Sequence, residues 1–327
     1  MAIPPDGWTC WISPDMQFPA IAKPPVGIVF DSAMDRIDDV IALAMLHGFE
    51  GKEQARIAAV SISRPDLEAA RFCDALRIFY SSAITGPAAM FMHAPAVGLA
   101  DGKPGGGVPM LDVAETNKSA IKSVIDTADP ATLIRNSLMA YHDQNAAVVL
   151  SGPATNLAKL LDMYDAKELV KRKVRLLCMT EIGLDGDPAA ARVVRAGWPG
   201  PIATVDRQVG ESLPFPGASL DKDFAWATAH PMVDAYRVYR PMPYDAPSWA
   251  MAAVLYAVRP KEKYFQLSDG KVLLDPAQKE NIIRAYIDLA SAKPVPRKPR
   301  KPPDDKKDDK KAEKKDEKNA EKKDQKQ

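Results

Sequence analysis

The chain has 327 residues, 46% of them hydrophobic, and a formal net charge of +1. The charge is uneven: the segment from residue 293 onward holds 15 Lys/Arg and 9 Asp/Glu, which leaves −5 on the preceding residues. A mildly acidic body argues against a specific nucleic-acid-binding protein. No apolar run reaches the roughly 20 residues of a membrane-spanning helix, so we expect no transmembrane segment.

The two ends of the chain differ in composition from the part between them. Residues 1–25 are rich in proline and are expected to form an extended arm, and residues 26–292 the folded domain. Residues 293–327 are mostly Lys, Asp, Glu and Pro, so we expect disorder or a weak, salt-sensitive tether to polyanions. The N-terminus lacks the basic and apolar regions of a signal peptide, which favours the cytoplasm.

Short apolar strands alternate with helices along residues 26–292. Strands are predicted at residues 26–30, 55–62, 88–92, 146–152, 174–179 and 202–205. Helices are predicted at residues 40–46, 65–81, 132–142, 187–194, 221–240, 247–257 and 276–292, and a further one runs from the turn at residues 153–156 through residue 161. A hairpin is predicted around Asp269-Gly270, and the glycine-rich residues 98–112 are expected to be a connecting loop. The alternation predicts an α/β fold with a mostly parallel, doubly wound sheet, C-terminal helices and a disordered tail.

Four carboxylates follow the first predicted strand: Asp31, Asp35, Asp38 and Asp39. Asp38 and Asp39 fall where a helix begins, and carboxylates are favoured there by the free N–H groups and the helix dipole. Four acids exceed what capping requires, and ligands bind at this edge of an open α/β sheet. The alternative is a solvated loop with a helix cap. Arg36 could neutralise the cluster by pairing with a neighbouring acid, which would make a metal dispensable.

Cysteines and histidines give no metal-site pattern. Three cysteines, Cys10, Cys73 and Cys178, fit neither a disulfide framework nor a zinc site, and Cys73 and Cys178 are expected to be reduced core residues. The four histidines share no spacing and are interpreted as surface or core residues.

Five segments of the chain resemble the inosine/uridine-preferring nucleoside hydrolases, over roughly residues 26–275. They are the Asp-rich residues 30–43, Ser-Gly-Pro-Ala-Thr-Asn-Leu at 151–157, Asp-Pro-Ala-Ala-Ala at 187–191, Gln-Val-Gly-Glu-Ser-Leu-Pro-Phe-Pro at 208–216 and the Pro-Ser-Trp segment at 246–260. The resemblance implies the fold of that family and its reaction, in which a calcium-activated water hydrolyses the N-glycosidic bond of ribonucleosides. Calcium takes several oxygen ligands and orients the sugar while a carboxylate accepts the proton of the water.

Carried over by position, the resemblance also implies roles for single residues. Asp38 would contact the ribose, Asp39 and the carbonyl of Thr155 would bind Ca²⁺, and Glu181 would lie near the 5′ side of the sugar. Trp249 stands where some members of the family have a histidine; its aromatic face could stack on a nucleobase, and it could equally be a core residue. Thr155 could serve only in capping. The implied ligand is a ribonucleoside or a related ribosyl compound, and a homo-oligomer is a further candidate assembly.

Three positions depart from the family pattern. Ala33 stands where the family has the Asp that is both calcium ligand and general base, Ala250 where it has the last calcium ligand, and Gly183 where an Asn is expected. No catalytic residue is intact, and Asp35 is the candidate substitute as base and as metal ligand. A missing base removes a factor of roughly 10²–10⁴ in rate. Two functions stay open: a hydrolase with an altered calcium site, and a non-catalytic nucleoside- or sugar-binding or scaffold protein, a pseudoenzyme.

Overall fold

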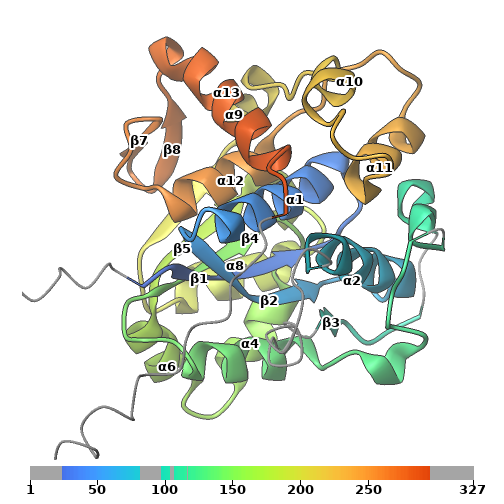
Figure 1. Ribbon diagram of the computed structural model, residues 1–327. Helices are drawn as coiled ribbons and strands as arrows, with labels where there is room; N and C mark the ends of the chain where they lie inside the picture. Colours follow the sequence, from blue (N-terminus) through green and yellow to red (C-terminus); the bar gives the residue numbers. More distant parts are fainter. Residues whose placement is uncertain (1–23, 82–96, 104–106, 116, 295–327) are drawn as a thin grey trace, which may run out of the picture.

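The computed structural model describes residues 24–81, 97–103, 107–115 and 117–294 (Figure 1). These residues contain an eight-stranded sheet with the strand order β3-β2-β1-β4-β5-β6-β8-β7. The strands are β1 (Val26–Ser32), β2 (Ala55–Ile62), β3 (Val97–Leu99), β4 (Ala146–Leu150), β5 (Val174–Thr180), β6 (Ile202–Val205), β7 (Phe265–Ser268) and β8 (Lys271–Leu274). Every neighbouring pair is parallel except β7 and β8, which form the predicted antiparallel hairpin. The predicted α/β fold with a mostly parallel sheet is confirmed. The predicted N-terminal arm and disordered tail lie almost entirely outside the described residues.

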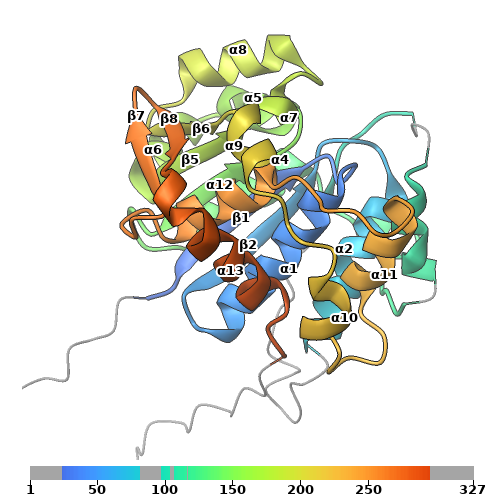
Figure 2. The ribbon, with the colours of Figure 1, turned by 90° about the horizontal axis from the view of Figure 1, so that it is seen from above.

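Helices cover both faces of the sheet. One face carries α1 (Ile37–Gly51), α2 (Leu67–Ser81), α11 (Pro231–Tyr239), α12 (Trp249–Val258) and α13 (Lys279–Ala290). The other carries α4 (Pro130–Met139), α5 (Thr155–Asp162), α6 (Ala166–Lys173) and α8 (Pro188–Gly197). Figure 1 shows α1, α12 and α13 above the sheet and α4 and α6 below it, and Figure 2 shows the same layers from above. No helix in these ranges combines the length and apolarity needed to span a membrane.

The strand residues alternate between two hydrophobic cores. In β1, Ile28 and Phe30 join the core beneath α1 and α12, whereas Val29 joins the core on the opposite face. All seven residues of β1 are buried, which is why this parallel strand has a nearly continuous apolar sequence. Cys73 and Cys178 are buried and free, as predicted, and Cys10 lies outside the described residues.

The chain reverses its winding direction between β1 and β4. From β1 it runs outward to β2 and β3, then returns to β4 on the other side of β1 and continues to β5 and β6. The crevice outside the carboxyl ends of the two central strands is the place where open α/β sheets bind ligands. The connections after β1 and β4 meet there, and the Ser151 N–H donates to the Asp31 carbonyl at 2.7 Å.

The predicted helix at residues 221–240 is wrong, because the structure has two helices there. The short helix α10 (Ser219–Asp223) ends before α11, and the non-helical residues 224–230 separate them. His230 caps α11 by accepting the Met232 N–H at its Nδ1 at 3.2 Å. Proline disfavours a helical conformation in the residue before it, so a helix begins at Pro231 and does not continue through it.

Three other predictions differ in detail. The predicted strand at residues 88–92 lies outside the described residues, and β3 lies partly within the loop predicted at residues 98–112. The predicted helix at residues 276–292 is a 3₁₀ turn, η3 (Pro276–Gln278), followed by α13. Helix α6 was not predicted, because five of its eight residues are charged and they obscure its apolar face.

Candidate functional site

The first acid of the cluster, Asp31, lies near the carboxyl end of β1 and connects this strand to β2 and α5. Its side chain is fully buried, and its Oδ2 accepts hydrogen bonds from Ser61 Oγ on β2 at 2.6 Å and Asn156 Nδ2 on α5 at 2.9 Å. Burial raises the pKa of Asp31 to about 7, although these two hydrogen bonds oppose the shift. Asp31 therefore fixes the end of β1 against β2 and α5.

The paired acids Asp38 and Asp39 lie in the first turn of α1 and are fully buried. The Ala250 N–H, at the start of α12, donates to Asp38 Oδ2 at 2.8 Å. The Ser151 hydroxyl, just after β4, donates to Asp39 Oδ1. Each acid thus ties α1 to a segment more than 100 residues away in the sequence.

Arg36 lies among the carboxylates of the cluster. Its Nε is 3.3 Å from Asp38 Oδ1, its Nη2 is 3.1 Å from Asp39 Oδ1, and its Nη1 is 3.4 Å from Asp35 Oδ1. Nη2 also donates to the carbonyl of Ser151 and, at 2.9 Å, to its Oγ. Burial alone would lower the pKa of Arg36, but the three carboxylates raise it above its ordinary value, so the guanidinium stays charged.

The two buried acids titrate at unusually high pH. Burial raises the pKa of Asp39 to about 7; Arg36 and Ser151 oppose this shift and Asp38 adds to it. Burial likewise raises the pKa of Asp38, against the opposing charge of Arg36. A pKa near 7 suits a general base. The exposed fraction of Asp39 is 0%, however, so solvent does not reach its carboxylate in this conformation.

Glu181 and Trp249, the two residues predicted to contact the ligand beside Asp38, lie together at the rim of the crevice, because both bond the backbone of Arg207. Glu181 is exposed at the start of α7 (Glu181–Leu184), and its Oε2 accepts the Arg207 N–H at 3.3 Å. The indole N–H of Trp249, which is half-buried, donates to the Arg207 carbonyl at 2.9 Å. The Trp249 ring packs against α9 (Arg207–Ser212), where a Cβ added at Gly210 would lie 2.1 Å from it. Trp249 therefore packs against α9 as a core residue would, although its ring is only half-buried.

Asp35 and Thr155 have partners that bear on their predicted roles. The Asp35 side chain is 36% exposed and is paired with Arg36. Thr155 begins α5, and its hydroxyl donates to Asp187 Oδ2 at 3.1 Å. Asp187 also accepts the Ala190 N–H at 3.0 Å, which confirms it as the predicted N-cap of α8.

Sequence reasoning missed the contribution of the segment after β4. Ser151 bonds both Arg36 and Asp39, and the backbone at Gly152 approaches the β1 loop so closely that a Cβ there would lie 2.5 Å from the Ala33 nitrogen. The available signal was the Ser-Gly-Pro sequence directly after a buried strand. Its partners are more than 100 residues away, so the sequence does not show which groups the serine contacts.

Comparison with solved structures shows that this chain has the nucleoside hydrolase fold. It matches an inosine-uridine preferring nucleoside hydrolase from Bacillus anthracis with a TM-score of 0.57 and 12% identity, covering 81% of this chain and 99% of that one. An inosine-guanosine nucleoside hydrolase gives 0.55 and 14%, covering 81% and 99%. The type III effector XopQ, solved with adenosine diphosphate ribose, gives 0.58 and 12%, covering 83% and 94%. No protein-family model and no curated sequence matches the chain.

Proposed function

We propose that this protein is a non-catalytic binding protein built on the nucleoside hydrolase fold, which does not hydrolyse nucleosides with a calcium-activated water. The observation that carries the proposal is the Arg36 guanidinium, which lies within ion-pair distance of Asp35, Asp38 and Asp39. A cation supplied by the chain already balances the acids that resemble the calcium-binding loop.

The donor groups at this edge do not fit a calcium ion. Calcium requires six to eight oxygen ligands, and its affinity depends on how many of them are charged. Ala33 and Ala250 supply no side-chain oxygen, and the Ala250 N–H points its hydrogen at Asp38 Oδ2. Oδ1 of Asp39 is engaged by Arg36 and Ser151, and its buried Oδ2 has no hydrogen-bond partner among the described residues. A divalent ion at either buried acid would lie close to the Arg36 guanidinium, whose positive charge would repel it.

A general base is also missing from the accessible part of the site. Asp38 and Asp39 are buried, and Asp35, the most exposed acid of the cluster, is held at 3.4 Å by Arg36. A carboxylate oxygen that already accepts a guanidinium N–H is less available to an attacking water. Within the described residues, Asp35, Asp38 and Asp39 are therefore poorly placed to act as the general base.

The proposed ligand is a ribosyl compound bound at the rim of the crevice. Three considerations support this: the crevice lies where the sheet changes winding direction, Glu181 and Arg207 offer exposed polar groups there, and Trp249 offers a half-buried ring. XopQ, which has the same fold, was solved with adenosine diphosphate ribose.

The proposal is tested by calorimetry and a hydrolysis assay on the full-length protein. Titrations would use calcium chloride, inosine, ribose and adenosine diphosphate ribose, and the assay would use inosine, uridine and a chromogenic riboside, with an active nucleoside hydrolase as the positive control. We expect saturable binding of at least one ribosyl compound, no heat of calcium binding and no hydrolysis above the uncatalysed rate. Calcium-dependent turnover would overturn the proposal, and so would the absence of binding by all three ribosyl probes.

A further inference from the structure

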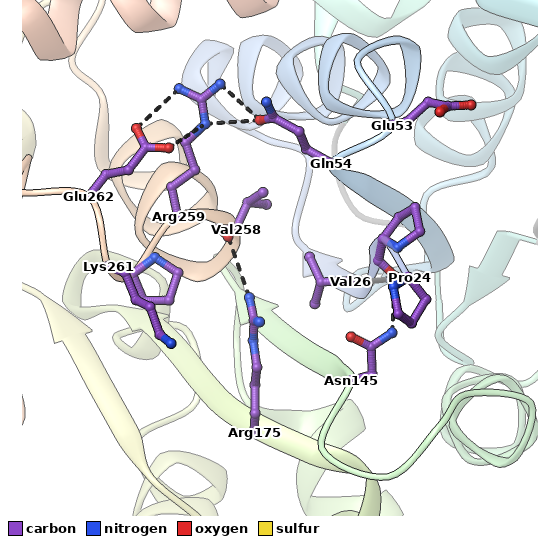
Figure 3. Close-up of a pocket in the computed structure, with 12 residues that line it drawn as sticks. Pro24, Val26, Glu53, Gln54, Asn145, Arg175, Val258, Arg259, Lys261 and Glu262 are labelled. Atoms are coloured by element: carbon purple, nitrogen blue, oxygen red, sulfur yellow. Dashed lines mark hydrogen bonds and ion pairs between the residues drawn. The ribbon is translucent and has the colours of Figure 1, made fainter. Parts of the chain in front are cut away.

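A pocket of about 450 Å³ lies at the end of the sheet opposite the aspartate cluster (Figure 3). Val26 at the start of β1, Asn145 before β4 and Arg175 near the start of β5 line it together with the turn after α12. These residues are at the amino ends of the strands, so the pocket is distinct from the crevice at their carboxyl ends. Its volume is sufficient for a small organic ligand.

Two cations that line this pocket, Arg175 and Lys261, have no acidic partner in the part of the chain that the structure describes. Arg175 Nη2 donates to the carbonyls of Ala257 at 2.8 Å and Val258 at 3.4 Å, and its buried Nε has no hydrogen-bond partner in the described part of the chain. Within the same residues neither Arg175 nor Lys261 lies within 4.0 Å of a carboxylate oxygen. Burial lowers the pKa of Arg175, which means that its charge is poorly solvated and would be stabilised by an anion.

The acids that line the pocket do not neutralise these two cations. Glu262 pairs with Arg259 at 3.4 Å, and Arg259 also donates to Gln54 Oε1 at 2.8 Å. The Arg259 guanidinium also stacks on the Phe49 ring, with its Cζ 5.1 Å from the ring centre, which fixes its position. The Glu53 side chain is 80% exposed, and Figure 3 shows it away from Arg175 and Lys261.

We propose that this pocket binds a small organic oxyanion, a molecule with one carboxylate or phosphate group and an apolar body. Arg175 and Lys261 hold the charged group by charge-assisted hydrogen bonds. The apolar body lies against Pro24, Val26 and Val258, which form the less polar wall. This site is independent of the crevice that we assign to the ribosyl ligand.

The test is the thermal unfolding of the full-length protein at increasing concentrations of phenyl phosphate or benzoate, with sodium chloride at matched ionic strength as the reference. The variants are Lys261→Ala and, as the matched control, Lys263→Ala, since Lys263 is also exposed but does not line the pocket. We expect at least one probe to raise the Tm of the wild type and of Lys263→Ala in a saturable way. In Lys261→Ala the dissociation constant should rise about tenfold, as expected for the loss of one charge-assisted hydrogen bond.

Three results would overturn the proposal. The first is a Tm that responds to both probes no more than to chloride. The second is an equal response of Lys261→Ala and Lys263→Ala. The third is a response that is lost in Arg36→Met but kept in Lys261→Ala, because the anion would then bind at the other end of the sheet.

Discussion

Arg36 and the acids around it form a buried ion-pair group. The Arg36 side chain is 17% exposed, and those of Asp38 and Asp39 are 1% and 0% exposed. A buried ion pair adds little net stability, because desolvation of the charges offsets their attraction. Removing one partner is different, since it leaves an uncompensated charge in the interior.

At this scale we predict the effect of Arg36→Met. The variant leaves Asp38 and Asp39 without their cation, so the free energy of unfolding should fall by about 3–5 kcal/mol. Calcium should recover part of this loss in the variant and leave the wild type unchanged, because only the variant has unpaired carboxylates to offer. Urea unfolding with and without calcium chloride measures both effects.

The matched control for this prediction is Arg64→Met. Arg64 lies at the same edge of the sheet and pairs with Asp66, which has a 10% exposed side chain and receives the N–H groups of Glu68 and Ala69. This pair is more exposed and retains those other donors, so we expect a smaller loss and no calcium response. An equal fall in the free energy of unfolding in the two variants would contradict the claim that Arg36 neutralises a buried acid cluster.

The sequence indicated part of this residue-level arrangement. The position of Asp38 and Asp39 at a helix start followed from local pattern, and so did the pairing of Arg36 with a neighbouring acid. The contacts of Ser151 and of the Ala250 N–H could not be predicted, because they depend on how β4 and α12 pack against α1. The roles implied for Glu181 and Trp249 stay predictions.

Helix α1 is buried on nearly all sides, and it packs closely against α13. Its residues from Ile37 to Phe49 are all buried, including those that face away from the sheet. A helix that is apolar around its whole circumference belongs in a core. At Gly48 a Cβ would lie 2.0 Å from the Leu289 carbonyl oxygen of α13.

For this pair of helices we predict that Gly48→Ala destabilises the protein. Alanine is normally better than glycine in a helix by about 1 kcal/mol, but here the methyl group must displace the backbone of α13. We expect a net loss of about 1–3 kcal/mol in the free energy of unfolding, measured by urea denaturation. In the control Gly197→Ala, at the end of α8, the nearest atom is 3.6 Å away and no such loss is expected. A stabilised Gly48→Ala would show that the two helices can separate.

Element prediction from this sequence succeeded where the local pattern was unambiguous. The strand predicted at residues 55–62 matches β2, and the Asp-Pro start of α8 was correct. It failed between residues 221 and 240, where α10 ends at Asp223 and a new helix begins at Pro231 after the non-helical residues 224–230. Whether residues 26–292 form one domain stays a prediction.

At the scale of the whole molecule, one buried hydrogen-bond chain joins three helices. Because His230 Nδ1 accepts the Met232 N–H, the neutral ring carries its proton on Nε2, which donates to Tyr80 Oη at 3.1 Å. The Tyr80 hydroxyl donates in turn to the Ala290 carbonyl at 3.2 Å. Burial lowers the pKa of His230 to about 3, and the nearby His47 adds to the shift.

The buried, neutral His230 in this hydrogen-bond chain predicts that the free energy of unfolding depends on pH. Between the unfolded pKa of 6.5 and the folded value of about 3, only the unfolded state binds the proton of His230. The contribution of His230 to the free energy of unfolding should therefore fall by about 1.4 kcal/mol per pH unit as the pH drops through this window. Asp31 and Asp39 act in the opposite sense, because their pKa values, raised to about 7, favour the folded state on acidification between about 7 and 3.8.

The difference between the wild type and His230→Asn separates the contribution of the histidine from those of Asp31 and Asp39, which are present in both proteins. Asparagine can still cap α11 but does not titrate. Urea unfolding at pH 7, 6 and 5 should show the two proteins converging in stability as the pH falls. Parallel curves would mean that His230 is not neutral in the folded protein.

The place of Arg36 between β1 and α1 has a consequence for how the fold depends on its surroundings. A bound ion can be removed by a chelator or exchanged for a competing ion. The Arg36 guanidinium is covalently part of the chain, so it cannot be removed or exchanged. The loop that resembles a calcium-binding segment would then keep its shape in a compartment without free calcium. Dialysis of the protein against a chelator should leave the midpoint of its urea unfolding curve unchanged.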